Sequence, residues 1–114
     1  SGPRPGKELA AACGFTLACG TGEREIEGGI YCCDLLSIVM GRAPADGLWV
    51  TVMGNLNSIA VAVLTDSACI LLAEGMALDE DARLRGEQQD VTVLKTPLPV
   101  YEAARAAAKA LGLP

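Results

Sequence analysis

Three acidic residues are the first candidates for chemistry in this sequence. Asp34, Glu74 and Glu102 carry carboxylates that could act as general acid or base, but nothing in their spacing places two of them at working distance. The chain has no histidine, which excludes Ser-His and Cys-His nucleophile pairs. It also lacks the Gly-x-x-x-x-Gly-Lys-Ser/Thr segment that holds phosphates in P-loop kinases. These observations disfavour an enzyme.

The second group of reactive side chains is a set of five cysteines, namely Cys13, Cys19, Cys32, Cys33 and Cys69. Their odd number and apolar neighbours predict reduced, buried thiols. A zinc or iron–sulfur site would need Cys-x-x-Cys pairs or histidine partners, and the sequence has neither. We therefore expect structural thiols, with no metal, no other cofactor and no regulatory disulfide between Cys32 and Cys33.

Three polar turns that follow apolar strands form the candidate ligand-binding site. In open parallel sheets, ligands bind beyond the carboxyl ends of the strands, where helix N-termini present free N–H groups. A site for a small anionic metabolite or nucleotide would then gather Asn55, Asn57, Glu74, Gly75, Lys95 and Thr96. We expect Asn57 to cap the following helix and Asn55 to lie outside it, with its amide free to meet a ligand. The structural alternative stays open, in which Asn57 is only a cap and Glu74 faces water.

The composition limits the class of protein that must position these turns. A chain of 114 residues with 51% hydrophobic and 20% charged residues fits one globular domain. The net charge of -5 argues against a nucleic-acid or anionic-membrane partner, because both need a basic face. No apolar run reaches the length of a membrane span, and no secretory signal opens the sequence. We expect a cytoplasmic protein.

The first half of the chain predicts a mixture of short helices and strands. The expected elements are a flexible arm at 1–6, a helix over 7–13 stopped by Gly14, a strand over 15–19, an irregular strand within 26–33 and a helix ending at Gly41. Asp34 has the position of an N-cap for that helix, since a short carboxylate can bind the free N–H groups of a first turn.

The second half predicts strands that alternate with helices. The expected elements are strands over 48–53, 68–72 and 91–94, an exposed helix over 79–89, and a final helix with Pro99 at its first position and Gly112 after its end. Residues 58–66 fit either a hairpin strand or a helix buried on all sides. If this segment is helical, the alternation predicts parallel strands with right-handed crossovers.

Several segments resemble the DRTGG domain family, and together they span the chain from about residue 7 to residue 113. The segments are Tyr31–Met40, Leu48–Val52, Asn57 with Ala60–Ala62, Ile70–Gly75 and Thr96–Glu102. The resemblance implies a single three-layer α/β/α domain over 7–114 with a mostly parallel sheet, like the N-terminal domain of HPr kinase/phosphorylase. It also implies that 58–66 is helical.

The same resemblance implies a regulatory setting. Such domains occur alone, beside CBS domains in regulatory pyrophosphatases, and in phosphotransacetylases; standalone members accompany iron-hydrogenase genes, which points to anaerobic metabolism. This chain departs from the family pattern at three places. Leu64-Thr65-Asp66 stands where members often have Gly-Asp-Arg, Ala73-Glu74-Gly75 replaces Thr-Gly-Gly, and Asn55 replaces a histidine of many standalone relatives.

The resulting hypothesis is a non-catalytic regulatory or small-ligand-binding domain, with a purely structural dimerisation or protein-interaction module as the alternative. A homodimer is expected because the apolar fraction exceeds what a domain of this size readily hides. The alanine-rich last helix can approach either the sheet or a second copy closely.

Overall fold

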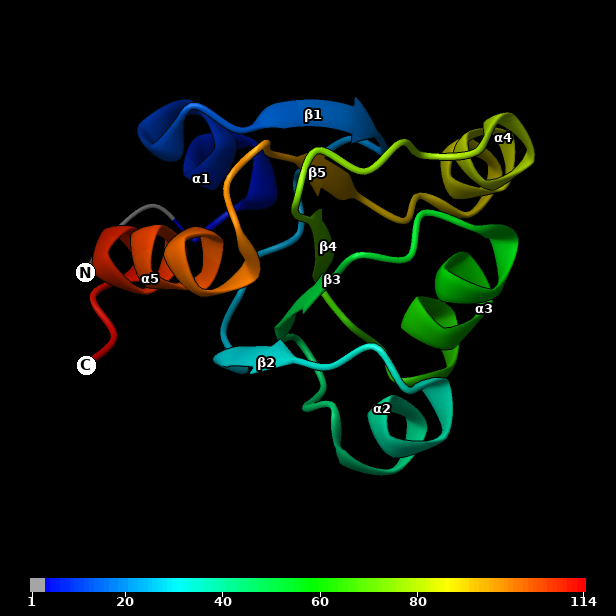
Figure 1. Cartoon of the computed structure of the whole chain (residues 1–114), viewed down its shortest axis with the longest axis horizontal. Helices are drawn as coiled ribbons and strands as arrows, with labels where there is room; N and C mark the ends of the chain where they lie inside the picture. The colour runs from blue at the N-terminus through cyan, green and yellow to red at the C-terminus, as the bar shows by residue number, and fades with distance from the viewer. Residues whose placement is uncertain (1–3) are drawn as a thin grey trace.

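Strands and helices alternate along most of the chain, as the sequence predicts (Figure 1). The computed structural model describes residues 4–114. Within these residues the elements are α1 (Gly6–Cys13), β1 (Thr16–Cys19), β2 (Ile30–Cys32), α2 (Leu36–Arg42), β3 (Leu48–Thr51), α3 (Leu56–Leu64), β4 (Cys69–Leu72), α4 (Glu80–Gln89), β5 (Val93–Lys95) and α5 (Val100–Leu111).

The strands form one sheet in the order β1-β5-β4-β3-β2. The four strands β2 to β5 are parallel, and only β1 runs antiparallel, paired with β5 so that Thr16 lies opposite Lys95. The segment after β3, for which the residues alone allowed a strand or a helix, is the helix α3, as the resemblance implied.

The helices cover both faces of the sheet, which confirms the three-layer α/β/α architecture. Successive parallel strands advance in one direction from β2 to β5, so right-handed crossovers place their connecting helices α2, α3 and α4 on the same face. Helices α1 and α5 cover the other face (Figure 1). Each face has its own apolar core, one around Leu9 and Ala103 and the other around Val39, Ile59 and Ala82.

The central strands β3 and β4 are buried at every residue because both faces of the sheet are covered. Along β3, Leu48 and Val50 pack on the α1–α5 side, whereas Trp49 packs on the side of α2, α3 and α4. The indole N–H of Trp49 donates a 2.8 Å hydrogen bond to the carbonyl of Cys33, so this single tryptophan also fixes the end of β2.

Helix α3 is not buried on all sides, contrary to the prediction for a helical segment of this composition. Ile59 and Ala62 face the core, but the side chains of Val63 and Leu64 are 48% and 69% exposed. Apolar residues therefore occur on both the inner and the outer side of this helix.

Residues 20–29 run along the amino ends of the parallel strands and tie them together. The Arg24 guanidinium donates to the Asp66 carbonyl at 2.9 Å and forms ion pairs with the carboxylates of Asp46 and Asp66. Beside them, the backbone N–H of Thr21 donates to Asp90 at 2.9 Å. The three aspartates have positive φ angles of 50–59° and each lies in a turn just before a parallel strand.

Part of the expected N-terminal arm belongs to the packed fold. Gly6 is the first residue of α1 and is buried, and Pro5 forms a β-bridge with Glu25. Residues 1–3 of that arm lie outside the described residues. At the other end of the chain, Pro99 is the N-cap of α5 and not its first residue, which is Val100.

Candidate functional site

At the carboxyl ends of β4 and β5 two loops are joined by backbone hydrogen bonds. The N–H of Glu74 donates to Leu98 at 2.8 Å, and the N–H of Gly75 donates to Thr96 at 3.0 Å. Glu74 and Gly75 both adopt left-handed backbone conformations, with φ of 63° and 67°. This tight turn directs both N–H groups to the neighbouring loop, so they are not available to a ligand.

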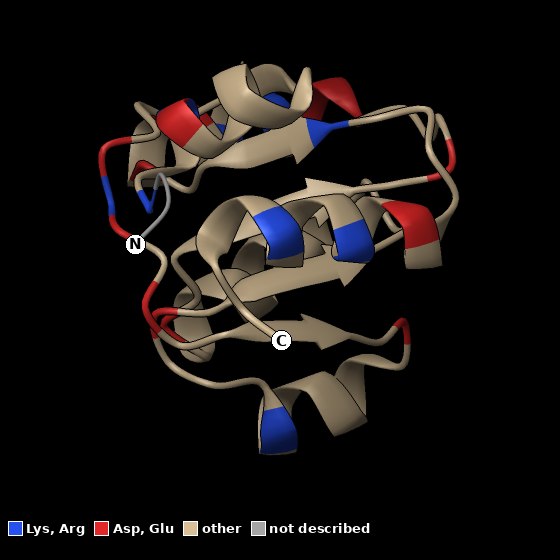
Figure 2. Cartoon of the chain, turned by 90° about the vertical axis from the view of Figure 1, so that its left-hand side faces the viewer, with Lys and Arg blue, Asp and Glu red and all other residues tan. Residues whose placement is uncertain are grey.

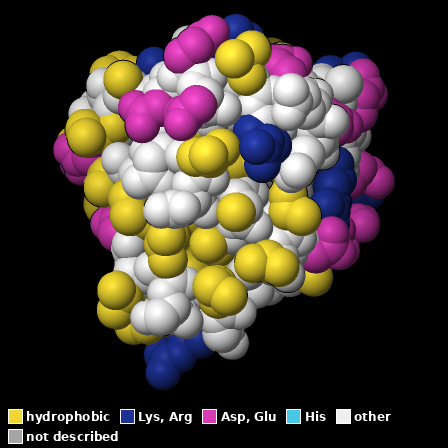
Figure 3. Space-filling view, turned by 90° about the vertical axis from the view of Figure 1, so that its right-hand side faces the viewer, with side chains coloured by type: hydrophobic (Ala, Val, Ile, Leu, Met, Phe, Trp, Pro, Cys, Tyr) yellow, Lys and Arg dark blue, Asp and Glu magenta, His cyan; other side chains and the backbone are white. Residues whose placement is uncertain are grey.

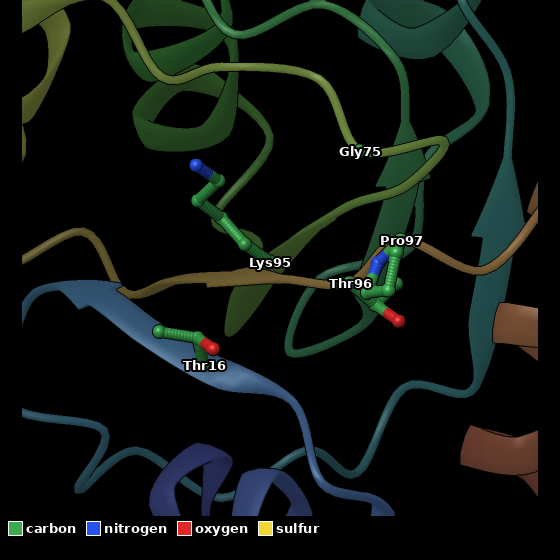
Figure 4. A pocket seen from close by; sticks show the side chains of 5 residues that line it. All are labelled: Thr16, Gly75, Lys95, Thr96 and Pro97. Carbon is green, nitrogen blue, oxygen red and sulfur yellow. The ribbon is translucent and has the colours of Figure 1, made fainter.

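An open hollow of about 250 Å³, named here the Lys95 hollow, lies beside these loops (Figure 4). It is lined by Thr16, Gly75, Lys95, Thr96 and Pro97. Three of the six residues predicted for the site, Gly75, Lys95 and Thr96, therefore come together. Thr16 and Pro97 complete the hollow and were not predicted.

Lys95 supplies the positive charge of the hollow. Its side chain is partly buried and forms no ion pair with any residue between 4 and 114. Because Thr16 and Lys95 are opposite each other on antiparallel strands, their side chains lie on the same face of the sheet. The hydroxyl of buried Thr96 accepts a 3.2 Å hydrogen bond from the N–H of Leu98, which holds the loop at this edge.

Glu74 has a structural role at the start of α5 and does not line the Lys95 hollow. Its Oε2 accepts a 2.9 Å hydrogen bond from the N–H of Val100, the first residue of the helix. A carboxylate at this position also meets the positive end of the helix dipole. Sequence spacing could not predict this cap, because Glu74 lies 26 residues before its partner.

The prediction that Asn57 caps α3 is wrong, because Asn55 is the cap. Asn55 has the extended backbone of an N-cap residue, and its Oδ1 accepts a 3.2 Å hydrogen bond from the N–H of Ser58. Buried Ser58 adds a second hydrogen bond at the start of this helix, since its hydroxyl donates to the Met53 carbonyl at 2.7 Å. Asn57 is exposed within the helix and lines a separate hollow between α3 and α4. Neither asparagine lines the Lys95 hollow.

The prediction that Asp34 caps α2 is also wrong, since the N-cap position belongs to Leu35. Asp34 instead accepts hydrogen bonds from the Thr51 hydroxyl at 2.7 Å and from the N–H of Val52 at 3.0 Å. The carboxylate therefore satisfies the fully buried Thr51 and joins the loop after β2 to the end of β3. Asp34 and Glu74 are both engaged in structural hydrogen bonds, which leaves no support for their role as an acid/base pair.

The cysteines are free thiols with different surroundings. Cys19 and Cys69 are buried, and burial raises the pKa of Cys19 to about 11 and also raises the pKa of Cys69. Cys13 and Cys33 are half-buried and Cys32 is exposed, so the expectation that all five are buried is confirmed only for Cys19 and Cys69. Within residues 4–114 no group of three or more His, Cys, Asp or Glu side chains is placed to hold a metal ion.

The directions in which the helices leave the sheet explain where the Lys95 hollow lies. In open α/β sheets, a crevice forms where neighbouring strands send their helices to opposite faces. The parallel strands advance from β2 to β5 without reversal, but α4 follows β4 on one face of the sheet and α5 follows β5 on the other. The antiparallel strand β1 begins beside the end of β5 and adds Thr16 to the hollow, which explains why Thr16 could not be found from its sequence neighbours.

Comparison with known proteins gives a fold likeness and no family assignment. No family model and no curated protein matches the sequence. The structure resembles a crystal structure of the CBS and DRTGG domains of the regulatory region of Clostridium perfringens pyrophosphatase, complexed with the activator diadenosine tetraphosphate. The TM-score is 0.71 at 7% sequence identity, and the likeness covers 90% of this chain but 45% of that one. The chain thus has a DRTGG-like α/β fold and spans less than half the length of the neighbour.

None of the helices among the described residues is long and apolar enough to cross a membrane.

Proposed function

We propose that this chain is a non-catalytic regulatory domain that binds a nucleotide or another small anionic metabolite at the Lys95 hollow. The observation that carries the proposal is the ammonium of Lys95, which has no acidic partner among residues 4–114 although the chain as a whole has a net charge of -5. An unpaired cation beside an open hollow favours a negatively charged ligand, because the ligand would then neutralise it.

The size of the hollow indicates which part of a ligand it would hold. Pockets for drug-sized ligands have volumes of about 300–1,000 Å³, and the Lys95 hollow has about 250 Å³. It fits a small anionic metabolite, or the phosphate end of a nucleotide whose remaining atoms lie on the surface. The hydroxyl of Thr16 offers a polar contact on the same face of the sheet as Lys95.

The fold neighbour supports the regulatory part of the proposal and the choice of a nucleotide. That structure is a regulatory region and holds the activator diadenosine tetraphosphate. The non-catalytic part rests on the absence of histidine and on the structural hydrogen bonds of Asp34 and Glu74. Cytoplasmic location and an association with hydrogenase metabolism stay predictions from the sequence.

A melting-temperature screen with diadenosine tetraphosphate, ATP, ADP and acetyl phosphate tests this proposal. At about 100 times its Kd, a ligand stabilises the folded state by about 2.7 kcal/mol, which raises Tm by about 10 °C for 114 residues. Lys95→Gln should remove most of this shift, whereas Arg42→Gln, a matched change at an exposed cation of α2, should preserve it. If no compound raises Tm, or if both variants respond like the wild type, the proposal is wrong.

A specific observation favours the homodimer as a second proposal. Helix α3 presents Leu56, Ala60 and Leu64 at intervals of four residues, with Leu64 69% exposed. Figure 3 shows hydrophobic side chains gathered over α2 and α3, on the side of the molecule away from α5. Rows of this spacing pack against each other in helix pairs. A two-fold axis at the small Ala60 would place Leu56 of each copy against Leu64 of the other.

Light scattering at tens of micromolar tests the dimer and the surface it uses. Leu64→Glu should give monomers, because it buries a charge in the proposed contact. Tyr101→Glu, on the alanine-rich helix α5, should leave the dimer intact. A monomeric wild type would refute the dimer, and a dimer sensitive only to Tyr101→Glu would move the contact to α5.

A further inference from the structure

A second surface, unrelated to the Lys95 hollow, lies between α5 and the edge strand β2. It is a groove of about 700 Å³. Its apolar part is lined by Ile30, Ala104 and Ala108, and its polar part by Arg105 and Lys109. Figure 2 shows the two basic residues of α5 on the outward side of this helix, above the edge of the sheet.

The charge of the groove is opposite to that of the chain. Arg105 and Lys109 are exposed and form no ion pair within residues 4–114, whereas the other basic residues on this side, Arg4 and Lys7, are paired with glutamates. Among the described residues no aspartate or glutamate lines the groove, although the chain has 14 acidic residues against 9 basic ones. Charge complementarity therefore favours an acidic occupant.

The edge of β2 offers backbone groups to the same occupant. β2 is the outermost strand and, within residues 4–114, pairs only with β3. The carbonyl of Gly29 accepts a hydrogen bond from the N–H of Leu48, and the N–H of Cys33 donates one to the carbonyl of Val50. In a parallel ladder, successive residues of a strand direct their backbone N–H and C=O groups to alternate sides. The N–H and C=O groups of Ile30 and Cys32 therefore point away from β3. Such an unpaired edge can accept an added strand.

The spacing of the two cations matches an extended peptide. Arg105 and Lys109 are one helical turn apart, which corresponds to about 6 Å along the axis of α5. Alternate side chains of an extended strand are separated by about 6.6–6.8 Å and point to the same face. A peptide added to the edge of β2 can therefore direct two acidic side chains, separated by one residue, towards Arg105 and Lys109.

We propose that the groove between α5 and β2 binds an extended acidic peptide segment of a partner protein, which adds a strand to the edge of β2 and pairs acid-x-acid side chains with Arg105 and Lys109. Ile30, Ala104 and Ala108 would pack against the apolar side chains of the peptide. A nucleotide fits this groove less well, because its apolar lining offers few polar groups to recognise a base, while the backbone of β2 suits a strand.

The test begins with selection from a displayed library of random short peptides on the full chain. The enriched peptides should carry acidic residues at alternate positions, and their synthetic versions should bind more weakly as salt increases. The double variant Arg105→Glu with Lys109→Glu should weaken binding at least about tenfold, while Arg42→Glu, an exposed cation on the opposite face of the sheet, should not. Both variants should keep the wild-type Tm, since these side chains are exposed.

Amide hydrogen exchange by NMR reports the position of the peptide. Binding should slow the exchange of the Ile30 and Cys32 amides, whose N–H groups become paired with the added strand. The proposal is overturned if no peptides are enriched, if the enriched peptides lack alternate acids, or if exchange slows elsewhere. It is also overturned if ATP or diadenosine tetraphosphate perturbs Arg105 and Lys109, which would make the groove a nucleotide site, or if these residues are needed only for self-association.

Discussion

Replacement of Asn55 by alanine should destabilise the protein, because Asn55 caps α3. Its Oδ1 accepts a 3.2 Å hydrogen bond from the N–H of Ser58, one of the N–H groups that a helix start leaves without a partner. Alanine at this position cannot accept that bond. Asn57, two residues further along the chain, is exposed and its replacement removes no hydrogen bond of the described structure.

The structure sets the expected size of the effect. Loss of an N-cap side chain costs about 0.5–2 kcal/mol. The N–H of Ser58 also contacts the Asn55 carbonyl at 3.1 Å, and this contact survives in the variant, so we expect a value near the middle of the range, about 1 kcal/mol. With an unfolding entropy of about 2.1 cal/mol/K per residue, 114 residues give about 240 cal/mol/K and a fall in Tm of about 4 °C.

Urea unfolding followed by circular dichroism, together with thermal melts, measures this change. Asn55→Asp is the conservative control, because its carboxylate can accept the same bond and favours a helix N-terminus. Asn57→Ala is the positional control and should be neutral or stabilise by a few tenths of a kcal/mol, since alanine has the higher helix propensity.

Two results would refute the reasoning. If Asn57→Ala destabilises the protein more than Asn55→Ala, then the cap belongs to Asn57, as the sequence alone predicted. If Asn55→Asp is as unstable as Asn55→Ala, then the hydrogen bond to Ser58 is not the source of the effect.

Gly54→Ala should cost more than about 2 kcal/mol of stability, because its Cβ would overlap a backbone carbonyl of the loop after β4. Gly41→Ala has open space around its Cβ and should stabilise the protein by about 0.5–1 kcal/mol, and chemical denaturation measures both changes. Asp34→Ala should cost about 1–3 kcal/mol by leaving the buried Thr51 hydroxyl without its acceptor, and a urea-unfolding cycle with Thr51→Val should recover part of that loss. Burial raises the pKa of Cys19 from 9.0 to about 11, so the unfolded chain ionises this thiol first. The stability it contributes is complete below about pH 9 and is lost as the pH rises to about 11, and urea midpoints over this interval should fall less steeply in Cys19→Ala.

Most of the elements could be predicted from the sequence because their signals are local. The apolar runs that became β3 and β4 predict strands covered on both faces, and the acidic start of α4 predicts a helix N-terminus. Gly14 and Gly112 end their helices in the left-handed conformation that glycine adopts without steric cost. With 58–66 taken as a helix, as the resemblance implied, the alternation of these elements indicates a mostly parallel sheet, which the structure confirms.

The polar side chains depended on partners that are distant in the sequence. Asp34 could cap its own helix or bind Thr51, and only the pairing of β2 with β3 brings Thr51 within reach. Glu74 and Val100 meet because β4 and β5 are neighbours in the sheet. A carboxylate accepts a hydrogen bond from whichever free N–H or hydroxyl group the fold places nearest to it. The spacing of residues in the sequence does not predict the distance between the carboxylate and that group.

The candidate site also combines residues that could be predicted from the sequence with one that only the tertiary structure revealed. The sequence determined that polar turns follow β4 and β5, and hence that Gly75, Lys95 and Thr96 lie at one edge of the sheet. Only the tertiary structure brought Thr16 beside them, because β1 pairs antiparallel with β5 across most of the length of the chain. The physical reason is that local propensity decides where a strand forms, whereas the burial of its faces against the rest of the chain decides which strand becomes its neighbour.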